Sequence, residues 1–60
     1  MDTFTAVMIA EGVDEAESEE QAIDAWQHLI DTGLAWQLQG SFGRTAQALI
    51  EQGICHLPGD

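Results

Sequence analysis

One cysteine and two histidines are the side chains in this 60-residue sequence best suited to nucleophilic catalysis or to metal binding. Cys55 and His56 are neighbours in the chain, which does not make their side chains face each other, as a thiolate–imidazole pair requires. Structural zinc sites use pairs of Cys or His at characteristic short spacings, and the sequence has none. Residues 11–20 also lack the central glycine of a calcium-binding loop. We therefore expect no enzymatic activity, no metal site and no cofactor.

The charge of the chain excludes two classes of partner. Lys and Arg together number 1 and Asp and Glu number 11, so the formal net charge is -10. A single Arg44 cannot neutralise a row of phosphates, and docking on anionic lipid needs clustered basic residues. We expect no direct binding of nucleic acid or membrane. No apolar run approaches the roughly 18 residues of a membrane span, and there is no basic signal-peptide start, so we expect a cytoplasmic protein.

The carboxylates are concentrated in one segment. Seven of the eleven lie between Glu11 and Asp24. A solvated connection with favourable charges at a helix start explains them, and so does electrostatic steering of a basic protein surface. Mimicry of a nucleic acid needs charge over a whole face, but residues after Asp24 are mostly Gln, Ala and apolar. The residues we assign to steering are Glu15, Glu17, Glu19 and Glu20.

Aromatic residues supply a second candidate surface. Because tryptophan and arginine are favoured where partners bind most tightly, we assign partner contact to Trp36, Phe42 and Arg44. Core packing is the alternative for the aromatic rings. For Arg44 the alternative is an exposed ion pair with Glu51 or Asp31, which contributes on the order of 0–1 kcal/mol.

Three similar segments predict where helices end. They read MIAEGV, LIDTGL and LIEQGI, and each places Gly where a helix terminates in the left-handed conformation. The apolar residue after each glycine then folds back onto the last turn. The expected pairs are Met8 with Val13, Leu29 with Leu34, and Leu49 with Ile54.

Helix starts can be matched to these ends. Thr3 is the expected N-cap of a helix over residues 4–11, with Phe4, Val7 and Met8 on one face. Ser18 and Gln21 have the spacing of a capping box, which predicts a second helix over residues 19–32. Its expected buried stripe is Ala22, Ile23, Trp26, Leu29 and Ile30.

The last third of the chain is less regular. Residues 34–39 alternate as a strand would, but no other segment offers a partner strand, so we predict a short helix ending by Gly40. Ser41 is the expected cap of a last helix over residues 42–52, in which Gly43 would admit a close neighbour. Together these elements predict a single all-α domain over residues 1–60. It is a small bundle of three main helices plus a short connecting one, with an acidic connection at 12–18 and a flexible tail at 55–60.

A resemblance rests on the run AWQHLIDTGLAWQLQGSFGRTA (residues 25–46), extended by LIEQGIC (residues 49–55). It is similar to a group of small, acidic, uncharacterised proteins encoded by tailed phages and prophages. The resemblance covers roughly the last two thirds of the chain and implies no activity. It implies a location in the cytoplasm of an infected bacterium or in a virion.

Two functions follow as expectations. The first is a non-enzymatic protein that binds a host or phage protein as an inhibitor or adaptor. The second is a self-associating structural or virion-associated component, because a core this small gains stability from association. A nucleic-acid mimic is the lesser alternative.

Overall fold

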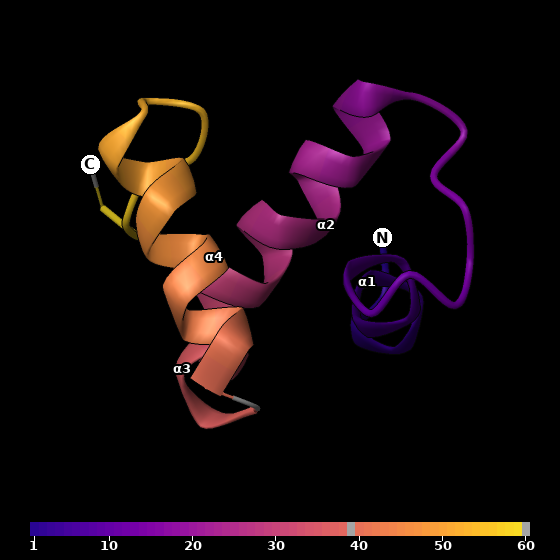
Figure 1. Ribbon diagram of the computed structural model, residues 1–60, viewed down its shortest axis with the longest axis horizontal. Helices are drawn as coiled ribbons and strands as arrows, with labels where there is room; N and C mark the ends of the chain where they lie inside the picture. Colours follow the sequence, from indigo (N-terminus) through magenta and orange to yellow (C-terminus); the bar gives the residue numbers. More distant parts are fainter. Residues whose placement is uncertain (39, 60) are drawn as a thin grey trace.

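The computed structural model describes residues 1–38 and 40–59. It contains four helices: α1 (Thr3–Ala10), α2 (Glu19–Thr32), α3 (Leu34–Gln37) and α4 (Gly40–Glu51) (Figure 1). The predicted all-α fold of three main helices and one short connecting helix is confirmed, and Leu34–Gln37 is helical rather than a strand. None of these helices, within the residues described, has the length and apolar character needed to cross a membrane.

Glycines in the left-handed conformation end three of the helices, as the repeated segments predict. The φ angles of Gly12, Gly33 and Gly53 are 81°, 81° and 77°. Behind the first glycine, the Val13 N–H donates to the Met8 carbonyl at 3.0 Å. Behind the third, the Ile54 N–H donates to the Leu49 carbonyl, also at 3.0 Å. These bonds satisfy carbonyls that the helix ends leave unpaired, so both stops are defined locally.

The start of α2 is also as predicted. The Ser18 Oγ accepts the Gln21 N–H at 3.1 Å. The Gln21 side chain returns this contact, because its Oε1 accepts the N–H of Glu17 at 2.6 Å. This is a capping box shifted by one residue, and it fixes the first turn of α2 against the acidic connection.

The caps of the other two main helices differ from the prediction. Asp2, not Thr3, caps α1, because its carboxylate accepts the Thr5 N–H at 2.9 Å and the helix begins one residue earlier. Hydrogen bonds from the side chain and then the backbone of Thr5 hold the pKa of Asp2 below its ordinary value. In α4, Gly40 is already helical, so Ser41 lies inside the first turn rather than before it.

Small residues set the distances between the helices. Each helix contributes one alanine with no exposed surface: Ala6, Ala25, Ala35 and Ala46. Around these alanines the core contains Leu29, Ile30, Phe42 and Cys55. In Figure 1, α2 and α4 form a V that α3 closes, and α1 lies beside α2 on the side away from α4. The predicted stripe of α2 included Leu29 and Ile30 correctly but omitted Ala25, whose small side chain carries little hydropathic signal.

The orientation of α1 differs from the prediction at Phe4, whereas Val7 packs against the core as expected. Its inner side consists of Ala6 together with Val7, Ile9 and Ala10, whereas Phe4 is 71% exposed. The helix has no charged residue, so its sequence does not mark an outer face. A hydrogen bond between Thr3 Oγ1 and His28 Nε2, which are 2.9 Å apart, joins the start of α1 to α2.

α3 packs closely against α4. The Trp36 ring lies over Gly43, where an added Cβ would lie 3.5 Å from Trp36 Cε3, so the predicted close neighbour of Gly43 is confirmed.

The segment after α4 is attached to α2. Cys55 is buried, with its Sγ near the Ile23 carbonyl, and both backbone groups of His56 bond to the Gln27 side chain. Flexibility of the tail stays a prediction, and residue 60 lies outside the described residues.

Candidate functional site

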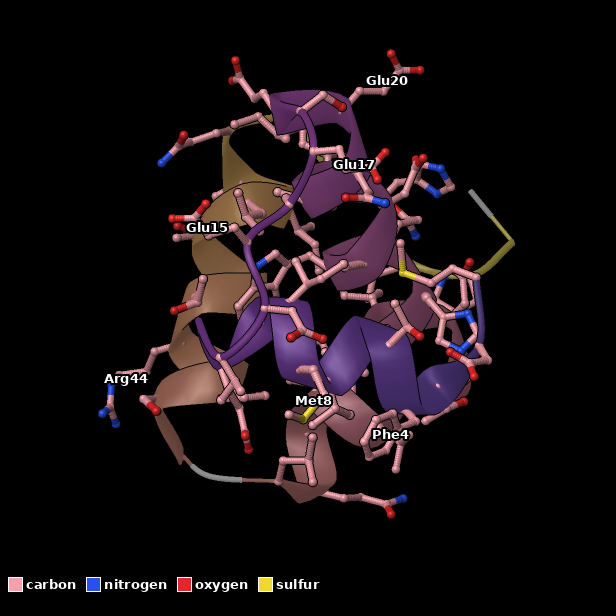
Figure 2. The ribbon with its side chains drawn as sticks, turned by 90° about the vertical axis from the view of Figure 1, so that its right-hand side faces the viewer. Phe4, Met8, Glu15, Glu17, Glu20 and Arg44 are labelled. Atoms are coloured by element: carbon pink, nitrogen blue, oxygen red, sulfur yellow. The ribbon has the colours of Figure 1, made fainter. Side chains whose placement is uncertain are left out.

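One side of the molecule combines exposed apolar residues with carboxylates. Figure 2 shows Phe4 and Met8 on the outer side of α1, with Glu15, Glu17 and Glu20 above them along the connection and the start of α2. Val13, which is 62% exposed, is bonded to the Met8 carbonyl and continues the apolar area. We call these six residues the acidic–apolar face.

The carboxylates of this face are available to a partner. Glu15, Glu17 and Glu20, with the neighbouring Glu19, are all exposed. Glu19 and Glu20 stand in the first turn of α2, where the helix dipole favours anions. The only basic residue, Arg44, lies on α4 at the edge of the view in Figure 2. The face therefore carries negative charge beside an uncharged apolar helix.

The structure separates the three residues assigned to partner contact. Phe42 is 6% exposed and packs against Trp26, with ring centroids 5.4 Å apart and an angle of 58° between the planes. Trp36 is 45% exposed, and Arg44 is exposed one residue after Gly43. Trp36 and Arg44 thus remain on the surface, while Phe42 is part of the core.

The two carboxylates considered as partners of Arg44 bond to glutamines of their own helices. The Gln27 Nε2 donates to Asp31 at 2.9 Å, and the Gln47 Nε2 donates to Glu51 at 3.4 Å. The Arg44 guanidinium lies instead near Gly40, where an added Cβ would be 3.6 Å from Nη1.

A groove of about 260 Å³ lies between α2 and α4. Its apolar walls are formed by Ala22, Ile23, Trp26, Leu49 and Ile54. Glu19 and Thr45, both exposed, add a carboxylate and a hydroxyl. We call this the α2–α4 groove. Ala22, Ile23 and Trp26 were expected in the core and Glu19 in the steering segment. The sequence signal for the groove is that these four residues lie on one stripe of α2 with a charged end.

The groups considered for catalysis and metal binding do not form a cluster. Cys55 is buried, its Sγ is 3.9 Å from the Ile23 carbonyl oxygen, and desolvation followed by the charge of Asp31 raises the pKa of its thiol. His28 bonds to Thr3, and the His56 ring nitrogen Nδ1 lies 3.2 Å from the Leu57 carbonyl oxygen. Among the described residues, no group of three or more His, Cys, Asp or Glu side chains is placed to hold a metal ion.

Comparison with known proteins identifies a family whose function is unknown. Residues 5–60 match the model of DUF7417, a domain of unknown function, so the chain belongs to this family. No characterised protein and no solved structure matches the chain significantly. The match covers α2, α3 and α4 and most of α1, and it begins one residue after Phe4.

Proposed function

We propose that this member of the DUF7417 family is a non-enzymatic protein that acts by binding another protein through its acidic–apolar face. The observation that carries the proposal is the position of Phe4, which is 71% exposed on a helix without charges and faces the same side of the molecule as the exposed carboxylates of Glu15, Glu17 and Glu20. The partner is a host or phage protein, and the bound chain acts as an inhibitor or adaptor.

The apolar half of the face supports binding because its exposed apolar side chains are not covered by the rest of the described chain. α1 has no charged residue, yet only its inner side packs against the core. Phe4 and Met8 are one helical turn apart, so a partner pocket can take both side chains. Aromatic residues and methionine are enriched in protein interfaces relative to the rest of the surface.

The acidic half supports a partner of opposite charge. Glu15, Glu17 and Glu20 are exposed on the same side as Phe4, and the chain as a whole carries a net charge of -10. Charge complementarity raises association rates and suppresses wrong partners more than it raises affinity. A basic surface around an apolar pocket fits this arrangement.

We propose a phage origin because residues 25–46 and 49–55 resemble proteins encoded by tailed phages. A phage protein of this kind acts in the cytoplasm of the infected bacterium. The exposed pair Trp36 and Arg44 supplies a second contact region on α3 and α4.

One observation favours self-association as the second candidate function. α1 is a main helix without charged residues, so two copies that pack through α1 bring few carboxylates together. A virion-associated oligomer would use the same Phe4 side chain. The mimicry of nucleic acid gains no such support, because α4 carries Arg44 and a single carboxylate, Glu51.

The test compares two serine variants at exposed apolar positions. Phe4→Ser removes the central side chain of the face, while Leu57→Ser changes an exposed residue of the tail and is the matched control. We expect the wild-type chain and Leu57→Ser to capture the same bacterial protein at low salt, and Phe4→Ser to lose it. Capture that is unaffected by Phe4→Ser would contradict the proposal. Light scattering over a concentration series tests the second candidate, which requires a dimer that Phe4→Ser converts to monomer.

A further inference from the structure

We propose that the α2–α4 groove binds one large apolar side chain of a basic segment in a partner protein, with a Lys or Arg of that segment meeting Glu19. The inference rests on the proposed function and refines it at a second surface. The structural basis is an apolar cavity that opens beside a carboxylate in a chain with one basic residue.

The size of the groove fits a single anchor side chain. A cavity of about 150 Å³ lined by apolar residues holds a benzene molecule, and this groove measures about 260 Å³. It can therefore receive a Leu, Ile, Met or Phe side chain, but not a whole helix. The Trp26 ring, held by Phe42 at 5.4 Å between centroids, gives the groove a fixed wall.

The arrangement of the walls explains why the groove is open. Ala22, Ile23 and Trp26 form one stripe of α2, and Leu49 faces them from α4, with Ile54 following the helix end. α2 and α4 diverge from their connection at α3, as Figure 1 shows, and Ile54 is 42% exposed at the far end. The apolar side chains in this space are left without a full set of packing partners, so an inserted apolar group would complete the packing.

Charge complementarity identifies the partner as basic. Glu19 contributes the charged group of the groove lining, and Glu20 is exposed beside it at the start of α2. A partner with a carboxylate at this position would be repelled, whereas Lys or Arg would be attracted. A second copy of the chain is a poor occupant, since each copy has Arg44 as its one basic residue and a net charge of -10.

The groove and the acidic–apolar face use different sides of α2. His28, which bonds to Thr3 of α1, is absent from the groove wall, and α1 contributes no residue to the lining. Occupation of the groove therefore leaves Phe4 and Met8 free. Variants on α1 and variants in the groove can separate the two surfaces.

The test uses designed peptides as probes. An alanine-based peptide of about 15 residues, long enough to form some helix in water, carries one Leu with a Lys one turn before and after it. A second peptide has Ala in place of the Leu, and a third has Glu in place of both Lys residues. Binding is followed by ¹H–¹⁵N NMR titration of the 60-residue protein.

We expect the Leu–Lys peptide to shift the amide signals of Ala22, Ile23 and Leu49 in a saturable way. Replacing its Leu by Ala should weaken binding about tenfold or more, as expected for an apolar side chain that becomes buried. Replacing both Lys by Glu should weaken binding severalfold at low salt, and this difference should shrink as salt screens the charges.

Two protein variants and two controls complete the experiment. Glu19→Gln should weaken the Leu–Lys peptide about two- to fivefold, since exposed ion pairs contribute little. Thr45→Phe places a ring at an exposed position of the lining and should abolish binding without disturbing the core. Asp31→Asn, at the other end of α2, and Phe4→Ser, on α1, should bind as the wild type does.

Three results would overturn the inference. The first is the absence of saturable shifts in the groove up to about 1 mM peptide. The second is equal binding of the Lys and Glu peptides. The third is a set of shifts in the groove that appears when the protein concentration is raised without peptide and does not change when peptide is added. Such shifts would mean that a second copy of the chain occupies the groove. Because Phe4→Ser tests the acidic–apolar face separately, failure in the groove and failure of the proposed function are distinguishable.

Discussion

The side-chain amide of Gln27 forms hydrogen bonds with both the N–H and the carbonyl of His56. Its Nε2 donates to the His56 carbonyl at 2.7 Å, and its Oε1 accepts the His56 N–H at 3.0 Å. These two bonds copy the pairing of adjacent β-strands with a side-chain amide. They join the middle of α2 to the segment after α4, two parts of the chain that are far apart in sequence.

Loss of this pairing should destabilise the fold. Each hydrogen bond contributes about 0.5–1.5 kcal/mol net, so Gln27→Ala should lower the free energy of unfolding by about 1–3 kcal/mol. Gln47→Ala, which loses one 3.4 Å bond to Glu51 on the exposed side of α4, is the matched control and should stay within about 0.5 kcal/mol. Urea denaturation measures both. Faster hydrogen exchange of the His56 amide in Gln27→Ala would show that the tail has been released, and unchanged exchange would contradict the role of Gln27.

Serine substitutions should distinguish a helix cap from a residue inside a helix. Ser18→Ala removes the hydroxyl that accepts the Gln21 N–H and should cost about 1 kcal/mol. Ser41→Ala is at an exposed position in the first turn of α4 and should stay within about 0.5 kcal/mol of the wild type. Thermal denaturation followed by circular dichroism compares the two. Equal losses would mean that Ser41 caps α4 after all.

Glycine substitutions should have opposite signs at two positions. An added Cβ at Gly43 meets the Trp36 ring at 3.5 Å, an ordinary contact, so Gly43→Ala should stabilise α4 by about 0.5–1 kcal/mol. Gly33 has a φ of 81° between α2 and α3, so Gly33→Ala should destabilise the chain by about 1–2 kcal/mol. The midpoints of thermal unfolding give both values. A stabilised Gly33→Ala variant would contradict the left-handed conformation at this stop.

The thiol of Cys55 should make stability fall at alkaline pH. Desolvation raises the pKa of Cys55 in the folded chain, so the folded state keeps a proton that the unfolded state releases. The contribution of this thiol to the free energy of unfolding should therefore be constant below the ordinary cysteine pKa of about 8.5 and decrease above it. The sequence has no Tyr, and its one basic residue is Arg44, so no other side chain titrates in this range.

Cys55→Ala is the control for this pH dependence. Its unfolding free energy should show no decrease between about pH 8.5 and 10. The native wild type should also react with a thiol-specific disulfide reagent more slowly than the urea-unfolded chain. Equal reaction rates in the two states would show that Cys55 is accessible.

Local signals made most of the helix boundaries predictable. Ser18, Gln21 and the glycines at 12, 33 and 53 act through bonds within a few residues, so their spacing predicted the ends of α1, α2 and α4 to within one residue. The start of α1 was misassigned because Asp2 and Thr3 are both good caps, and the sequence does not say which one receives the Thr5 N–H.

Features that depend on how helices meet were not predictable in the same way. An uncharged α1 gives no pattern that separates its two sides, so Phe4 was placed on the same face as Val7, although only Val7 packs against the core. Trp36 and Phe42 are both aromatic residues next to helix ends, so the sequence does not tell which of them is buried. In the structure Phe42 packs against Trp26 and is buried, whereas Trp36 is exposed. The α2–α4 groove depends on the angle between two helices, which no local pattern specifies.

The position of Arg44 in the middle of α4 has a practical consequence. Trypsin cleaves after Lys and Arg, and this sequence offers it the bond after Arg44 alone. That bond is helical in the native chain and becomes a substrate only when α4 opens. When opening and closing are fast compared with cleavage, the rate of digestion follows the population of the open form. Limited trypsin digestion therefore reports the local unfolding of α4 through a single pair of fragments, residues 1–44 and 45–60.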